Sequence, residues 1–244
     1  PPPSPRHFIN LGLANVSDDT LSSIFRAILD WHLTAFPPAV RSLCPSLIAA
    51  TLEIYSQAMA KLLPTPTKSH YVFNLRDFAR VVQGVMMLPA SQLPAEPAEA
   101  AALYKRLWAH EVFRVFYDRL VDDKDRAWLL GFVRTTLQRR FGAEFDALFK
   151  HLQVGGPSDA AAPSSVGTEH VRSLFFGDFM DDGGGGGGEE FAGSRRYSEY
   201  TDVPALLRKV EEYLVDHDAT SKRPMNLAVF LYAAEHVSRA ARVL

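Results

Sequence analysis

Cysteine, long apolar runs and an excess of either charge are all scarce in this sequence. Cys44 is the single cysteine among 244 residues, so no disulfide can form within the chain, and we expect its thiol to be a small apolar group of the core in a reducing compartment. No run of about 18 apolar residues occurs, so we expect no membrane-spanning helix. The 26 basic and 28 acidic residues give a net charge of −2. Such a balance gives no global field that attracts nucleic acid or an acidic membrane.

The motifs of several enzyme classes are also missing. The chain has no HExxH, paired-cysteine or GxSxG motif, so neither zinc nor serine-hydrolase chemistry is indicated. It has no Walker A motif, and no Asp or Glu pair ends an apolar strand. We therefore expect the chain alone to bind ATP weakly and to hydrolyse none. The six glycines from Gly183 to Gly188 are not followed by Lys-Ser or Lys-Thr, so they make no phosphate loop, and we predict a disordered insertion there.

Helical periodicity dominates the first two thirds of the chain. After a short apolar run typical of a buried strand, apolar residues recur at helical spacing, and the helices are separated by Pro-rich stretches. One helix has Pro45 near its first turn or at a kink, and the last one has a break at Phe141-Gly142. The expected elements are a strand over 8–14 and helices over 17–33, 40–63, from 74 onward, 103–120 and about 123–152.

The helix over 103–120 is apolar around nearly its whole circumference, so it must be buried. Its polar residues fall four apart on a single face, with Glu111 beside them. A buried helix with one polar line is expected to meet something polar along that line. We call this line the seam; its residues are Arg106, His110, Arg114 and Asp118.

The helix that begins after Asn74 has a strong start signal. Asn74 is a favourable N-cap, Asp77 is placed as its capping partner, and Phe73 and Phe78 occupy the positions of a hydrophobic staple. Arg76 contradicts the pattern, because the helix dipole disfavours a cation in the first turn. Two interpretations remain open: an anion clamp, in which the guanidinium and free N–H groups face one phosphate, or a surface arginine in contact with solvent.

The remaining third of the chain has a different character. Residues 154–168 are rich in Gly, Pro, Ser and Ala without periodicity, which predicts a flexible connection. The run from Val171 to Met180 is aromatic and strand-like. Asp202 opens a helix with Pro204 in its first turn, and the closing segment 224–244 is predicted to form an amphipathic helix.

Four of these stretches carry a family resemblance. The run WAHEVFRVFYDRLVDDKDR, from Trp108 to Arg126, resembles the helical lid of the third AAA+ module in dynein heavy chains. HYVFNLRDFARVVQG resembles the segment that carries the sensor 2 arginine of that module, with Arg76 at the matching position. RSLFFGDFM and the closing helix resemble the entry to the fourth module, and TSKRPMNLAVFLYAAEHVSRAARVL is more similar to the axonemal branch.

The resemblance implies a mainly α fold: a helical AAA+ lid with a few short strands that belong to incomplete flanking large subdomains. The implied division is the end of a large subdomain over 1–36, the lid over 37–153, a flexible linker over 154–170, and the start of the next module over 171–244. The poly-glycine insertion would occupy 181–196. In this arrangement the seam would dock the lid against its neighbour.

The resemblance also implies sites, ligands and partners. Arg76 would contact the phosphates of a nucleotide on the neighbouring large subdomain. Arg6, in Arg6-His7-Phe8, is similar to the end of a longer family segment whose arginine projects into the preceding module's nucleotide site, although the segment here is a few residues shorter. ATP or ADP would bind the intact motor and not the isolated chain. The implied partners are the rest of the heavy-chain ring and, through the intact motor, microtubules and the intermediate and light chains, with no nucleic acid or membrane.

Two classes of function follow from these observations. In the first, the chain is part of an ATP-driven, minus-end-directed microtubule motor of cilia or flagella, in which the lid senses nucleotide and transmits conformational change. In the second, it is a stand-alone helical interaction module without ATPase activity. Transcript sequence that continues past Leu244 into a GxxxxGK[ST] loop would favour the motor, whereas a stop codon there would favour the module.

Overall fold

The computed structural model describes residues 9, 11–12, 16–153, 165–180, 196–225 and 227–243. Of the strand predicted over 8–14, only Ile9, Leu11 and Gly12 are described, and none of the three is in a strand. Arg6, residues 181–195 of the predicted poly-glycine insertion and residues 154–164 of the predicted linker lie outside the described residues.

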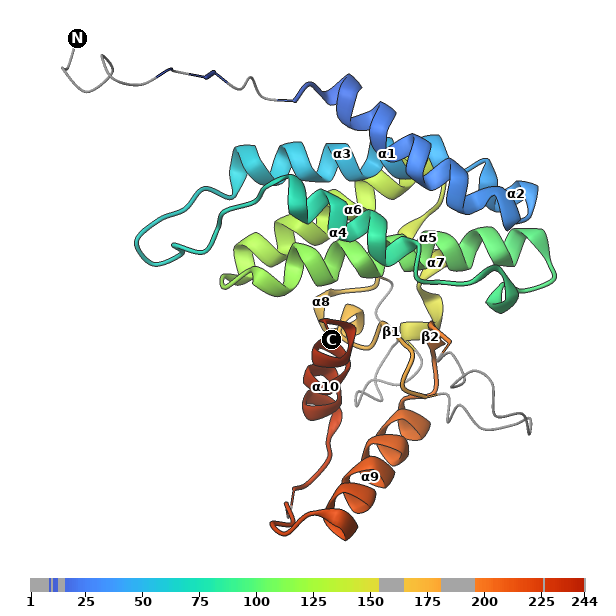
Figure 1. Cartoon of the computed structure of the whole chain (residues 1–244), viewed down its shortest axis with the longest axis vertical. Coiled ribbons are helices and arrows are strands. Elements are labelled where there is room, and N and C mark those ends of the chain that lie inside the picture. The colour runs from blue at the N-terminus through green and yellow to red at the C-terminus, as the bar shows by residue number, and fades with distance from the viewer. Residues whose placement is uncertain are drawn as a thin grey trace.

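Helices pack on one another through residue 153, as the mainly α prediction requires (Figure 1). Helix α4 packs against α5, and α3 packs against α1 and α6. These elements are α1 (Asp18–His32), η2 (Leu33–Ala35), α2 (Pro38–Arg41), α3 (Cys44–Lys61), α4 (Leu75–Val85), η3 (Ala90–Gln92), α5 (Pro97–Val115), η4 (Tyr117–Arg119), α6 (Asp123–Phe141), α7 (Phe145–Leu148) and η5 (Lys150–Gln153).

A second group of elements follows, which we call the C-terminal segment (described residues 165–243). It lies below the helical layers in Figure 1, with α10 next to them and α9 further away. Its two strands pair antiparallel, with Phe175 opposite Tyr200 and Gly177 opposite Ser198. The elements are α8 (Thr168–Val171), β1 (Phe175–Gly177), β2 (Ser198–Tyr200), α9 (Val203–Thr220) and α10 (Leu231–Val243).

The helix boundaries follow local capping chemistry. Ser17 Oγ accepts a hydrogen bond from Thr20 N at the start of α1, and Asp202 Oδ1 accepts one from Ala205 N at the start of α9. Gly142 ends α6 with φ of 59°, a left-handed conformation that a glycine adopts without a steric penalty. These starts and the break after Phe141 confirm the sequence predictions.

Several helices depart from their predicted extents. The helix expected over 103–120 is α5 (Pro97–Val115) followed by η4 (Tyr117–Arg119), and the closing helix expected over 224–244 is α10 (Leu231–Val243). The helix expected over 40–63 is divided into α2 and α3, with Pro45 in the first turn of α3. Because proline has no N–H, it cannot donate to the carbonyl of Arg41, and a new helix starts at this point instead. The closing helix was expected to bury an apolar stripe, yet Phe230 and Val237 are largely exposed, and the buried residues of α10 are Ala234, Glu235 and Ser238.

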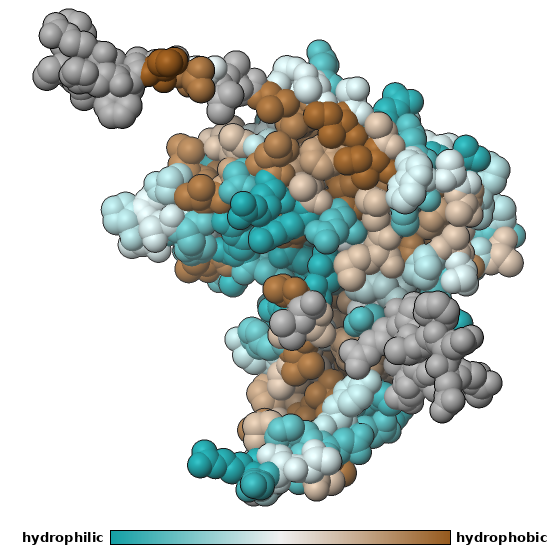
Figure 2. Space-filling view, in the orientation of Figure 1, coloured by the Kyte–Doolittle hydropathy of each residue, from teal (hydrophilic) through white to brown (hydrophobic). Residues whose placement is uncertain are grey.

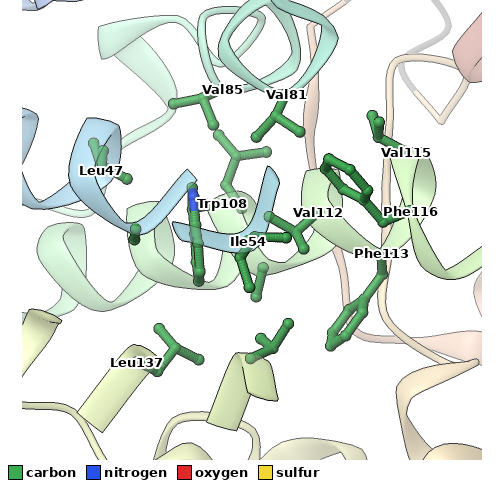
Figure 3. Close-up of a cluster of buried hydrophobic side chains, with 14 of the residues drawn as sticks. Leu47, Ile54, Val81, Val85, Trp108, Val112, Phe113, Val115, Phe116 and Leu137 are labelled. Atoms are coloured by element: carbon green, nitrogen blue, oxygen red, sulfur yellow. The ribbon is translucent and has the colours of Figure 1, made fainter. Parts of the chain in front are cut away.

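One apolar core joins the helical layers, and α5 runs through it (Figure 3). Trp108 is fully buried, with its indole nitrogen directed at α3 and Leu137 of α6 on the other side of its ring. Trp108 Nε1 donates to Thr51 Oγ1 at 2.9 Å, and that hydroxyl donates to Leu47 O at 2.7 Å. Cys44 is also fully buried, as predicted. The predicted burial of the central helix is therefore confirmed.

The Thr51 hydroxyl is expected to stabilise this core. Thr51→Val should lower the free energy of unfolding by about 1–3 kcal/mol, because the buried indole N–H loses its acceptor. Thr51→Ser keeps the hydroxyl and is the matched control, with a loss of less than half as much. Urea unfolding followed by tryptophan fluorescence measures both values. Equal losses in the two variants would contradict a role for the hydroxyl.

Candidate functional site at the seam of helix α5

The seam, which runs along α5 and ends at Asp118 in η4, faces the C-terminal segment and not solvent. Arg106 lies at one end of the contact and binds Glu199 of β2. The ring of His110 lies 5.0 Å from that of Phe176 in β1. At the other end, Asp118 lies 3.3 Å from Arg239 Nε of α10. The polar line predicted from the sequence therefore meets three different elements that follow the predicted linker.

The contact between Arg106 and Glu199 is bidentate. Arg106 Nε donates to Glu199 Oε1 and Oε2 at 2.8 and 2.9 Å, and Nη2 donates to Oε2 at 2.7 Å. The Glu199 side chain is 7% exposed. Burial acts to raise the pKa of this carboxyl, but His151 and Arg106 outweigh it and hold the pKa below its usual range. Glu199 therefore remains ionised, and a geometrically matched, charge-assisted pair fixes β2 on α5.

Glu111, beside the seam, is a fully buried carboxylate with donors from α5, α10 and the stretch before β2. Oε1 accepts from Tyr197 Oη at 2.8 Å and from His110 Nδ1 at 3.0 Å. Oε2 accepts from Arg242 Nη2 at 2.7 Å and from Nε at 3.1 Å. Each donor compensates part of the cost of taking this charge out of water.

The protonation states in this cluster follow from burial and charge. Burial alone would raise the pKa of Glu111, but His110 and Arg242 lower it to about 2. The pKa of His110 is lowered, chiefly by burial, so its neutral ring donates Nδ1–H to the carboxylate. The cluster thus contains one buried anion held by the cation of α10.

Asp118 joins two arginines at the far end of the seam. Its Oδ2 lies 3.2 Å from Arg114 Nη1 and 3.3 Å from Arg239 Nε. The Arg114 side chain is only 10% exposed, so its guanidinium is largely removed from water, like the Glu111 carboxylate. The two ends of the seam and Glu111 therefore hold β2, the stretch before it and α10 against α5 and η4.

Arg76 lies in the first turn of α4, and its side chain is exposed. The predicted cap is confirmed: Asn74 Oδ1 accepts from Arg76 N, and Asp77 Oδ2 accepts from Asn74 N, both at 2.9 Å. Arg119 supports this end of α4, because its Nη2 donates to the carbonyls of His70 and Val72. Among the described residues the Arg76 guanidinium has no hydrogen-bond or ion-pair partner.

Of the two arginines predicted to bind nucleotide, the structure describes only Arg76. Arg6 lies outside the described residues, so its predicted role has no structural account. No group of three metal-ligating side chains occurs within the described ranges. In the same ranges no helix is both long and apolar enough to cross a membrane.

The partners of the seam were not found from the sequence. Tyr197, Glu199, Arg239 and Arg242 come more than 70 residues after α5, beyond a long interruption in periodicity. One signal in the sequence could have indicated them. Glu111 has no cation placed to neutralise it within its own buried helix, so a partner from a distant part of the chain was required.

The sequence of the helical layers matches a known family. Residues 24–126, from within α1 to the start of α6, match the family model described as dynein heavy chain, ATPase lid domain. The curated relatives that match nearly the whole chain carry the same family name, among them dynein axonemal heavy chain 12 of Mus musculus, 39% identical over 242 residues. The chain belongs to the dynein heavy chain family. The resemblance noted in the sequence is thereby confirmed.

The dynein relatives are much longer than this chain. The match to the mouse protein covers 98% of the chain and 7% of the relative. Dynein axonemal heavy chain 3 of Homo sapiens is 38% identical over 240 residues, 98% of the chain and 5% of the relative, and human dynein axonemal heavy chain 6 is 34% identical over 239 residues. The match to the dynein lid model includes Arg76 and the whole seam. It ends before the residues of the C-terminal segment that the seam contacts.

Acid should weaken the dynein lid through Glu111. Its pKa is about 2 when folded and about 4.5 in the unfolded chain, so its contribution is fully present above pH ~4.5 and is lost as the pH falls towards 2. This contribution is on the order of 3 kcal/mol. Glu111→Gln removes the titrating group, so its unfolding free energy should fall less steeply over this pH range. Chemical unfolding at a series of pH values measures the slopes, and identical slopes would contradict the assignment.

Proposed function

We propose that this chain is the lid of the third AAA+ module of a dynein heavy chain together with the connection to the fourth module. In this role the lid senses the nucleotide state and passes conformational change around an ATP-driven ring. The observation that carries the proposal is that one buried helix, α5, is both the centre of the lid core and the dock for the C-terminal segment. Such a helix cannot move without moving what is bound to it.

Arg76 is the proposed nucleotide sensor. Its backbone is fixed by the reciprocal cap of Asn74 and Asp77, whereas its side chain is exposed and has no partner among the described residues. A cation held in the first turn of a helix is unfavourable by itself, and a phosphate at the same place removes the conflict. We propose that the phosphates of ATP or ADP on the adjacent large subdomain supply this charge in the intact motor, and that the isolated chain binds no nucleotide.

The exposed face of α1 is consistent with a missing neighbour. Trp31 is 73% exposed, and Ile24 and Ile28 are 50% and 41% exposed, so three large apolar side chains lie on one face of this helix. Figure 2 shows the apolar surface over α1. We propose that the large subdomain whose end occupies 1–36 covers it, with the lid over 37–153, the linker over 154–170 and the next module from 171. Helix α1 nevertheless packs on α3, so it moves with the lid.

The proposed setting is the axoneme of a cilium or flagellum, because the relatives quoted above are axonemal heavy chains. The proposed activity of the whole motor is ATP-driven, minus-end-directed movement along microtubules, with intermediate and light chains as further partners. A stand-alone interaction module is the second candidate. It is disfavoured because nearly the whole chain aligns with a small part of proteins many times longer.

Replacement of Arg76 tests the sensor assignment. In the full heavy chain, Arg76→Ala should weaken nucleotide binding at the third module by about 10- to 100-fold, the range expected for one lost charge-assisted contact. Nucleotide affinity at that module, measured with the other sites disabled, gives the value.

Arg41 offers a matched control, since it is another exposed arginine at the end of a short helix, α2. Arg41→Ala should leave the affinity unchanged. Unchanged affinity and turnover in Arg76→Ala itself would remove the sensor assignment and leave the docking role of α5 intact.

A further inference from the structure

Arg76 lies at the start of helix α4. Near the end of the same helix, Gly84 contacts the Glu111 cluster. This glycine lies in the last turn of α4, and it is buried. A Cβ atom built on Gly84 would lie 1.9 Å from Glu111 Oε2, 2.3 Å from Glu111 Cδ and 2.7 Å from Arg242 Nη2. Real Cβ atoms do not approach other atoms so closely, so the ion pair fills the space that a side chain at position 84 would need.

The Glu111 carboxylate cannot move aside freely, although it ends a flexible side chain. It is fully buried, and both of its oxygens are engaged by donors: Tyr197 and His110 on one, Arg242 on the other. A shift of the carboxylate would therefore leave buried donors without an acceptor. Arg242 is less confined, with 17% of its side chain exposed, but it loses its partner if Glu111 moves.

Gly131 provides a direct comparison within the same fold. It also lies in the interior of a helix, α6, but a Cβ atom there would meet nothing within 4 Å. Alanine is a better helix former than glycine, so an alanine at either position should favour the helix itself. The close contact with Glu111 and Arg242 is what sets Gly84 apart.

We propose that Gly84 is the positioning residue that locks helix α10 onto the lid, by admitting the Glu111–Arg242 pair against the backbone of α4. Helix α4 then holds Arg76 in its first turn and this lock in its last, about 12 Å further along its axis. The lock itself needs no nucleotide. Only its connection to Arg76 rests on the proposed function.

Hydrogen exchange on the 244-residue chain tests the lock by comparing Gly84→Ala with Gly131→Ala. In Gly84→Ala the amides of α10 should exchange at least about tenfold faster, whereas those of α3 and α6 in the helical core keep their protection. Gly131→Ala should leave both regions unchanged. Unchanged exchange in α10, or an equal loss of protection in α10 and the core, would overturn the proposal.

A double-mutant cycle with Glu111→Ala separates a lock from general damage to the fold. Without the Glu111 carboxylate the added methyl group has room, so Gly84→Ala should have little further effect on α10 exchange in that background. This result is expected even if Gly84→Ala alone folds poorly. Additive losses in the double variant would show that Gly84 acts independently of the ion pair. A negative result here leaves the Arg76 assignment untouched, since that is read from nucleotide affinity.

Discussion

The structure depends on a buried negative charge, the Glu111 carboxylate, which lies beside the seam of the buried helix α5. A carboxylate removed from water is costly unless it is paired and hydrogen-bonded. Helix α5 provides His110, and the C-terminal segment provides Tyr197 and Arg242. The desolvation cost of the Glu111 carboxylate is therefore compensated only when α10 and the stretch before β2 are docked on α5.

Helix α5 consequently has two different surfaces with two different roles. Its apolar residues, with Trp108 at the centre, hold α3, α4 and α6 together in one core. Its seam selects one geometry for the C-terminal segment, because a bidentate pair such as Arg106 with Glu199 forms only in a narrow range of orientations. The apolar core supplies rigidity and the seam supplies orientation. The proposed connector between two modules would need both, and here one helix provides them.

Much of the lid could be predicted from the sequence, because its signals are local. The Asn74 cap, the break after Phe141 and the single polar line of α5 depend only on residues a few positions apart. The partners of the seam could not be predicted, since a charge pair such as Glu111 with Arg242 spans 131 positions and leaves no periodic trace. The same limit explains α10: its apolar stripe was expected inside, whereas Glu235, paired with Arg172, is buried.

The most direct test of the docking account is a double-mutant cycle on Arg106 and Glu199, with unfolding free energies measured for the 244-residue chain and for Arg106→Ala, Glu199→Ala and the double variant. If the seam holds the C-terminal segment on α5, the two residues are coupled by roughly 1–3 kcal/mol, and the double variant loses clearly less than the sum of the two single losses. Strictly additive losses would contradict the account, because they would mean that the two side chains do not act through each other.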